Sequence, residues 1–125
     1  MTMTEDLLDY WLRLIRPIFP ENAWIVSNLS EGNHLIQIDW NIEHVPHRAN
    51  KRSRKIQITI PEKAIDHYLD KSKADRELSD TNLKNNISDR YRHFNPDHDA
   101  QTARSVATER WLISRDVLDG RLESR

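Results

Sequence analysis

Two segments in the middle of the chain alternate apolar and polar residues with a period of two, which is typical of a β-strand with one buried face. The first is HLIQIDWNI, residues 34–42, and the second is IQITI, residues 56–60. In the first segment one face carries Ile36, Ile38, Trp40 and Ile42, and the other carries Gln37, Asp39 and Asn41. Because a shift of one residue would expose the whole apolar set, the pattern predicts a sheet with one core face and one largely polar face.

A further strand is predicted immediately before these two. The segment AWIVSNL, residues 23–29, is rich in apolar and β-branched residues, and SEGN, residues 30–33, has the composition of a turn. We therefore expect residues 23–29 and 34–42 to form an antiparallel hairpin.

Four other segments carry apolar residues at the spacing of a helix. They are residues 4–18, with Thr4 as cap and Pro17 and Pro20 at the end; 61–71, opened by Pro61; 83–94, ended by Asn95-Pro96; and about 100–118, stopped by Gly120. The expected buried residues of the last helix are Ala103, Val106, Ala107, Trp111, and Val117 or Leu118. The predicted fold is a single α+β domain over residues 1–125, a three-stranded antiparallel sheet with one face covered by helices, in the order α-β-β-β-α-α-α.

Composition removes several classes of protein from consideration. The chain contains no cysteine, which excludes a disulfide framework, a thiolate metal site and a cysteine nucleophile. Its only two glycines, Gly32 and Gly120, lie too far apart to form a phosphate-binding glycine loop. The N-terminus does not resemble a signal peptide, and no run approaches the roughly 20 apolar residues of a membrane span. We expect a cytoplasmic protein without membrane contact.

One short basic run stands out in a chain whose formal net charge is -1. In HRANKRSRK, residues 47–55, the basic residues are Arg48, Lys51, Arg52, Arg54 and Lys55. Five basic residues and one acidic residue give residues 43–55 a charge of +4. The run connects two predicted strands, where two residues would be enough for a hairpin. Clustered Arg and Lys favour polyanions, so these five residues are the candidate anion or nucleic-acid site.

Two other groups of polar residues have the types needed for metal binding or acid–base chemistry. The histidine group comprises His44, His47, His93 and His98, with Asp97 and Asp99 beside the last of them. Residues five apart do not share a helix face and Pro96 interrupts the segment, so we expect neither a metal site nor any other cofactor. The acidic ridge comprises Glu62, Asp66 and Asp70, with His67 next to it, and we expect it to be solvated rather than catalytic.

The predicted order over the first 70 residues is similar to that of the double-stranded-RNA-binding domain. That family carries a histidine in a loop after its first strand and lysines at the start of its last helix, where this chain has EGNH (31–34) and PEKA (61–64). The resemblance is one of topology and implies contact with RNA. The chain departs from it at the helix, where Lys63 is alone beside the acidic ridge, and no functional residue is carried over.

The sequence favours a small, soluble, non-enzymatic protein-binding or regulatory module, whose partner is another protein or a second copy of the chain. Trp24 and the exposed side of the first helix are candidate apolar anchors. The alternative is nucleic-acid binding, mainly to phosphates, through residues 47–55.

Overall fold

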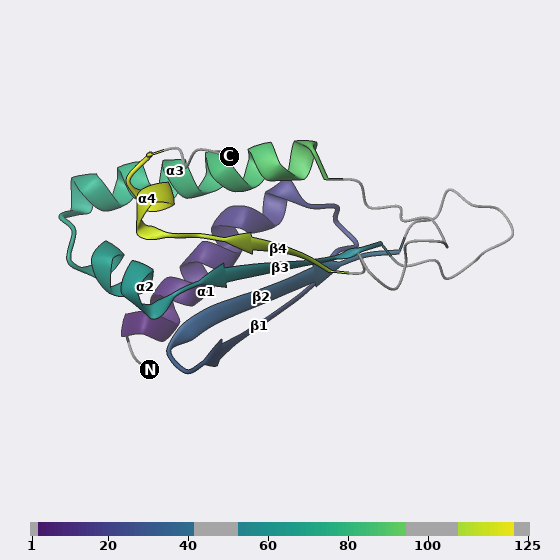
Figure 1. Ribbon diagram of the computed structural model, residues 1–125, viewed down its shortest axis with the longest axis horizontal. Helices are drawn as coiled ribbons and strands as arrows, with labels where there is room; N and C mark the ends of the chain where they lie inside the picture. Colours follow the sequence, from purple (N-terminus) through teal and green to yellow (C-terminus); the bar gives the residue numbers. More distant parts are fainter. Residues whose placement is uncertain (1–2, 42–52, 95–107, 122–125) are drawn as a thin grey trace, which may run out of the picture.

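The computed structural model describes residues 3–41, 53–94 and 108–121. Its elements in chain order are α1 (Met3–Ile15), a 3-10 turn η1 (Arg16–Ile18), β1 (Trp24–Ser30), β2 (Asn33–Asp39), β3 (Lys55–Ile60), α2 (Glu62–Leu69), α3 (Lys73–Arg92), β4 (Thr108–Leu112) and α4 (Arg115–Leu118). The strands form one sheet in the order β1-β2-β3-β4, and the helices lie on one side of it (Figure 1). The mixed α+β class and the one-sided covering of the sheet are thus confirmed.

The hairpin has the predicted position and a specific turn. Trp24 pairs with Asp39 at one end and Ser30 with Asn33 at the other, which leaves Glu31 and Gly32 as a two-residue loop. Both loop residues have positive φ, 54° and 83°, as a type I′ turn requires. The side-chain oxygen of Asn33 also accepts a hydrogen bond from the Glu62 backbone N–H, so the turn contacts the start of α2.

The prediction of three strands is wrong, because β4 adds a fourth strand parallel to β3. Residues 108–112 were expected within a helix over about 100–118, and of the described residues 108–118 only Arg115–Leu118 is helical. Trp111 pairs with Ile58, and the Ile113 N–H donates to the Thr59 carbonyl at 2.9 Å. Pairing satisfies main-chain groups along the edge of β3, which outweighs a weak local helix preference. The expected buried residues Ala103, Val106 and Ala107 lie outside the described residues.

Smaller differences concern the ends of helices. Helix α1 begins at Met3, before the expected cap Thr4. Helix α3 begins at Lys73, ten residues before the expected start at Leu83, because the Ser72 side chain caps it by accepting from the Asp75 N–H. The α-β-β-β-α order of the first 70 residues is present. His34, which the RNA-binding resemblance would place in an exposed loop, is instead 1% exposed in β2.

The buried apolar residues form one cluster between the sheet and the helices. Aromatic rings dominate the end of this cluster that lies near Trp40: Phe94 meets both Trp40 and Trp111 with centroids 6.0 Å apart, and Phe19 lies 5.2 Å from Tyr91. These edge-to-face contacts hold β4 and the end of α3 against the sheet.

Candidate functional site

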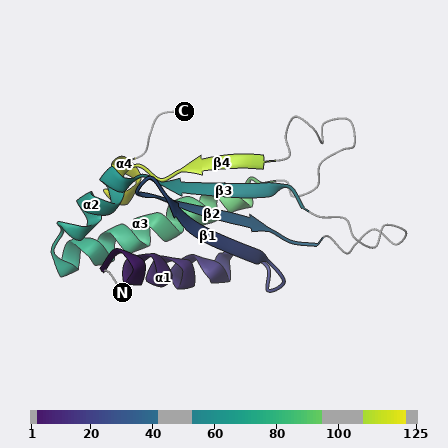
Figure 2. The same cartoon turned by 90° about the horizontal axis from the view of Figure 1, so that it is seen from below.

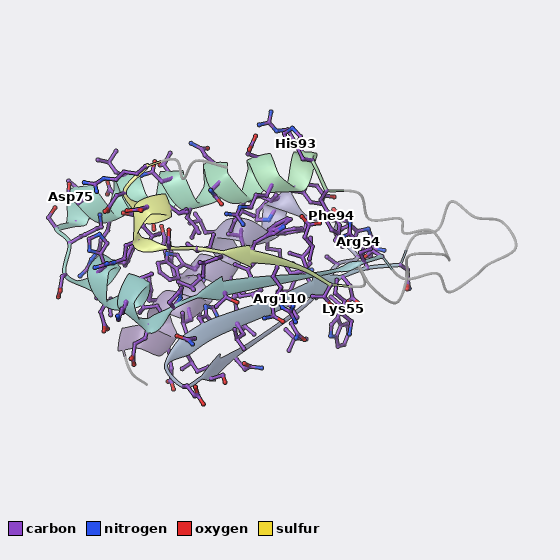
Figure 3. The ribbon with its side chains drawn as sticks, viewed as in Figure 1. Arg54, Lys55, Asp75, His93, Phe94 and Arg110 are labelled. Atoms are coloured by element: carbon purple, nitrogen blue, oxygen red, sulfur yellow. The ribbon has the colours of Figure 1, made fainter. Side chains whose placement is uncertain are left out.

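The two described residues of the predicted anion site lie on opposite sides of the sheet. Arg48, Lys51 and Arg52 lie outside the described residues, whereas Arg54 and Lys55 lie at the start of β3 and point to opposite sides (Figure 3). Arg54 is on the helical side, where its Nη2 lies 3.3 Å from Glu109 Oε2 and its guanidinium covers the Phe94 ring at 5.3 Å. Arg54 therefore has an internal role in joining β3 to β4 and to Phe94 after α3, and of the two described basic residues Lys55 is the one exposed for a ligand.

The sheet face turned away from the helices, here called the open face, combines apolar and basic side chains. Strand alternation and register place on it Trp24, Val26, Asn28, Leu35, Gln37, Asp39, Lys55, Gln57, Thr59, Thr108, Arg110 and Leu112. Trp24 is 67% exposed, and Trp24 and Lys55 line the same hollow of about 270 Å³ beside Gln37 and Asp39. Figure 3 shows Lys55 and Arg110 on this face. The expected polar face thus also carries large apolar side chains.

Strand β1 forms one edge of the sheet, and its main-chain hydrogen-bonding groups alternate in direction. The type I′ turn makes Ser30 and Asn33 a hydrogen-bonded pair, so Ser30, Asn28, Val26 and Trp24 direct their N–H and C=O groups toward β2. The same groups of Ile25, Ser27 and Leu29 then face away from the sheet. We call this row of three residues the β1 edge.

The β1 edge lacks the charged residues and prolines that often prevent strands from pairing with other chains. Its sequence, WIVSNLS, contains no charged residue and no proline, whereas the opposite edge strand, β4, contains Glu109 and Arg110. Of the six exposed large apolar residues in the described part of the chain, Trp24, Val26 and Leu29 belong to β1. A long, uncharged, apolar edge strand is a template for an added strand.

A hollow of about 220 Å³ lies where α1 meets the β1 edge, and we call it the seam hollow. Its lining residues are Glu5, Leu8 and Asp9 of α1, Ser27, Asn28 and Leu29 of β1, and His34 of β2. His34 is 1% exposed, and neither of its ring nitrogens has a hydrogen-bond partner in the described part of the chain. Burial lowers the pKa of His34 to about 4, although the nearby Asp9 charge acts in the opposite direction. The hollow therefore combines a neutral imidazole with carboxylates.

The acidic ridge does not act as a unit with His67. Glu62, Asp66 and Asp70 are exposed, as expected. His67 Nε2 instead lies 2.9 Å from Asp119 Oδ1, and Lys71 Nζ donates to the same carboxylate. The hydrogen bond from Lys71, followed by that from His67, lowers the pKa of Asp119. This cluster fastens α2 to the end of α4.

Asp80 is a second buried polar group, 9% exposed, at the junction of α1, α2 and α3. Its carboxylate accepts hydrogen bonds from the Tyr10 hydroxyl at 2.7 Å, the Tyr68 hydroxyl at 2.9 Å and the Trp11 indole N–H at 3.3 Å. Burial, together with the hydrogen bond to Asp80, raises the pKa of Tyr68. A carboxylate that accepts three hydrogen bonds from neighbouring helices is suited to holding them in place.

Most of the metal-binding candidates lie outside the described residues: His44, His47, Asp97, His98 and Asp99. His93 is exposed, and its Nδ1 lies 2.9 Å from the Asp89 carbonyl oxygen. Within residues 3–41, 53–94 and 108–121, no three His, Asp or Glu side chains gather closely enough to hold a metal ion.

Comparison with known proteins leaves the geometry as the basis for any functional argument. No protein-family model matches this sequence, and neither curated proteins nor solved structures give a significant match. Among the helices of the described residues, none has the length and apolar character needed to cross a membrane.

Sequence reasoning missed both the β1 edge and the seam hollow. The missing charge in WIVSNLS was visible, but its meaning depends on β1 lying at the edge, which only the strand order reveals. His34 is the first residue of the segment predicted as the second strand, and nothing local indicates that its ring lacks partners among the described residues.

Proposed function

We propose that this protein is a binding module that accepts an extended segment of a protein partner along the β1 edge. The observation that carries the proposal is the uncharged edge strand, with the N–H and C=O groups of Ile25, Ser27 and Leu29 facing outward. In strand addition, main-chain hydrogen bonds supply affinity and alternate side chains supply specificity. Trp24 and Val26, on the open face beside this edge, offer apolar surface to the outward-facing side chains of the added strand.

The position of α1 favours a single added strand over a second whole copy. In Figure 2, α1 lies outside the line of β1, on the helical side of the sheet. An extended peptide next to β1 would rest above α1. A second copy paired through its own β1 would place its own α1 beside this edge, where α1 of the first copy already lies.

The proposal is tested with the substitution Ser27→Pro. Proline removes an N–H that faces away from the sheet, so the fold should survive, since proline is tolerated on edge strands in this orientation. The matched control, Ser27→Thr, keeps the N–H. A library of random 12-residue peptides displayed on phage is selected against the full chain, and each enriched peptide is measured against both variants.

We expect enriched peptides to bind the wild-type and Ser27→Thr proteins and to lose at least tenfold in affinity for Ser27→Pro. Amide exchange at Ile25, Ser27 and Leu29 should slow when a peptide is added. Peptides that bind Ser27→Pro equally well, or a library without any enriched peptide, would overturn the proposal. If light scattering shows a dimer that Ser27→Pro abolishes, the occupant of the β1 edge is a second copy of the chain and not a strand of another protein.

A second candidate, nucleic-acid binding, is favoured by one observation on the open face. Trp24 and Lys55 line one hollow, and Arg110 lies on the same face, so a base could stack on the indole while the cations contact phosphates. Because Arg54 is bound to Glu109, at most four residues of the basic run would contact phosphate.

With four contacts, affinity for single-stranded DNA should fall about 50-fold between 50 and 200 mM salt, instead of about 130-fold for five. Trp24→Ala should weaken binding, whereas Leu78→Ala, at an exposed leucine of α3, should not. No retention on single-stranded DNA at 50 mM salt would exclude this candidate.

A further inference from the structure

The seam hollow lies directly beneath the path that a strand added to the β1 edge would follow. Ser27 and Leu29 belong to both features, since their main chains form the edge and both residues line the hollow. In an antiparallel pair, residues directly opposite each other project their side chains to the same face. A partner residue opposite Ser27 or Leu29 must therefore direct its side chain to the helical side, toward the hollow.

The chemistry of the hollow is that of a site for a cation. Asp9 and Glu5 lie one turn apart on α1 and supply carboxylates at its rim. At its base, the neutral His34 ring has one nitrogen that can accept a hydrogen bond, and neither nitrogen has a partner among residues 3–41, 53–94 and 108–121. Leu8 and Leu29 add apolar walls that suit the methylene stem of a long side chain.

We infer that the seam hollow is the specificity pocket of the β1 edge and that it receives a lysine or arginine side chain of the added strand, with the cation bound by Asp9 and His34. This inference rests on the proposed function and adds the chemistry of the recognised residue. The stem lies between Leu8 and Leu29, the cationic head donates to the Asp9 carboxylate, and the buried imidazole accepts a further N–H. The uncharged edge fixes the strand, and the pocket selects its side chain.

Charge distinguishes the side chains that could occupy the seam hollow. An acidic side chain would meet two carboxylates, and an apolar one would leave both nitrogens of His34 without partners, which is costly for a buried polar group. A lysine or arginine side chain can donate both to the Asp9 carboxylate and to the unprotonated nitrogen of the His34 ring.

The test uses the peptides selected on the full chain. We expect lysine or arginine to be enriched at one position of the peptides that depend on Ser27. Replacing that residue by norleucine should weaken binding about tenfold or more, in line with the loss of a charge-assisted hydrogen bond. On the Asp9→Asn protein the same replacement should change affinity less than threefold.

Asp6→Asn is the matched control, because Asp6 is an exposed aspartate of the same helix that does not line the hollow. It should keep the full discrimination between lysine and norleucine. The imidazole nitrogen resonances of His34 should also shift when the lysine peptide is added and stay in place with the norleucine peptide.

The two proposals fail in different ways. If selected peptides depend on Ser27 but show no preference for a basic residue, or if Asp9→Asn and Asp6→Asn behave alike, the pocket assignment is wrong and strand addition stands. If no peptide depends on Ser27, the proposed function itself is wrong.

Discussion

Replacing Asp80 by alanine should destabilise the protein more than any change on its surface. The carboxylate accepts hydrogen bonds from the Tyr68 hydroxyl and the Trp11 indole N–H, and both donors belong to buried residues. Leaving a buried donor unsatisfied costs about 1–3 kcal/mol, so two donors give about 2–6 kcal/mol. Tyr10 is 40% exposed and can turn its hydroxyl to water, so it adds little. The total is a large share of the roughly 5–15 kcal/mol that stabilises a typical domain.

Urea unfolding followed by tryptophan fluorescence measures this loss. With a slope of about 2 kcal/mol per molar urea, the midpoint should fall by about 1–3 M. The matched control is Asp75→Ala, at an exposed aspartate in the first turn of the same helix, which should cost less than about 1 kcal/mol. Adding Tyr68→Phe to Asp80→Ala should recover part of the loss, because it removes the Tyr68 hydroxyl, one of the two buried donors left unpaired, while the Trp11 N–H stays unpaired. An Asp80→Ala protein no less stable than Asp75→Ala would refute the reasoning.

Two further predictions concern stability. Burial lowers the pKa of His34 to about 4 from its usual 6.5, so the folded protein disfavours a proton on this ring. The unfolded chain binds that proton below pH 6.5, and the free energy of unfolding therefore falls as the pH drops from 6.5 toward 4. The loss is roughly 2–3 kcal/mol at pH 4.5. His34→Leu should remove most of that difference between urea midpoints at pH 7.5 and pH 4.5, and an unchanged difference would contradict this account. Gly32→Ala should cost about 1–2 kcal/mol, because Gly32 has a φ of 83° and a Cβ there would meet the Glu62 carboxylate. Glu31→Gly, at a φ of 54°, should be neutral or stabilising in the same urea unfolding assay, and equal losses for both variants would argue against the turn assignment.

The sequence by itself determined the elements whose signals are local. The predicted turn at residues 30–33, between the strand segments 23–29 and 34–42, indicated the β1–β2 hairpin, and the period of two predicted which side of β2 and β3 is buried. The spacing of Leu7, Trp11 and Ile15 likewise predicted the buried side of α1. In each case side-chain periodicity and turn chemistry act over a few residues, so no distant contact is needed to read them.

The tertiary structure decided what depends on pairing between distant segments. Trp111 and Ile113 are buried while Arg110 and Leu112 are exposed, an alternation that indicates a strand only once the edge of β3 is available to pair with it. Strand order then makes β1 an edge and places Glu109 of β4 beside Arg54, and the packing of α1 against the sheet covers His34. The candidate binding site could not be predicted from sequence because it is formed by unsatisfied groups. Whether a hydrogen-bonding group lacks a partner depends on every segment that folds around it.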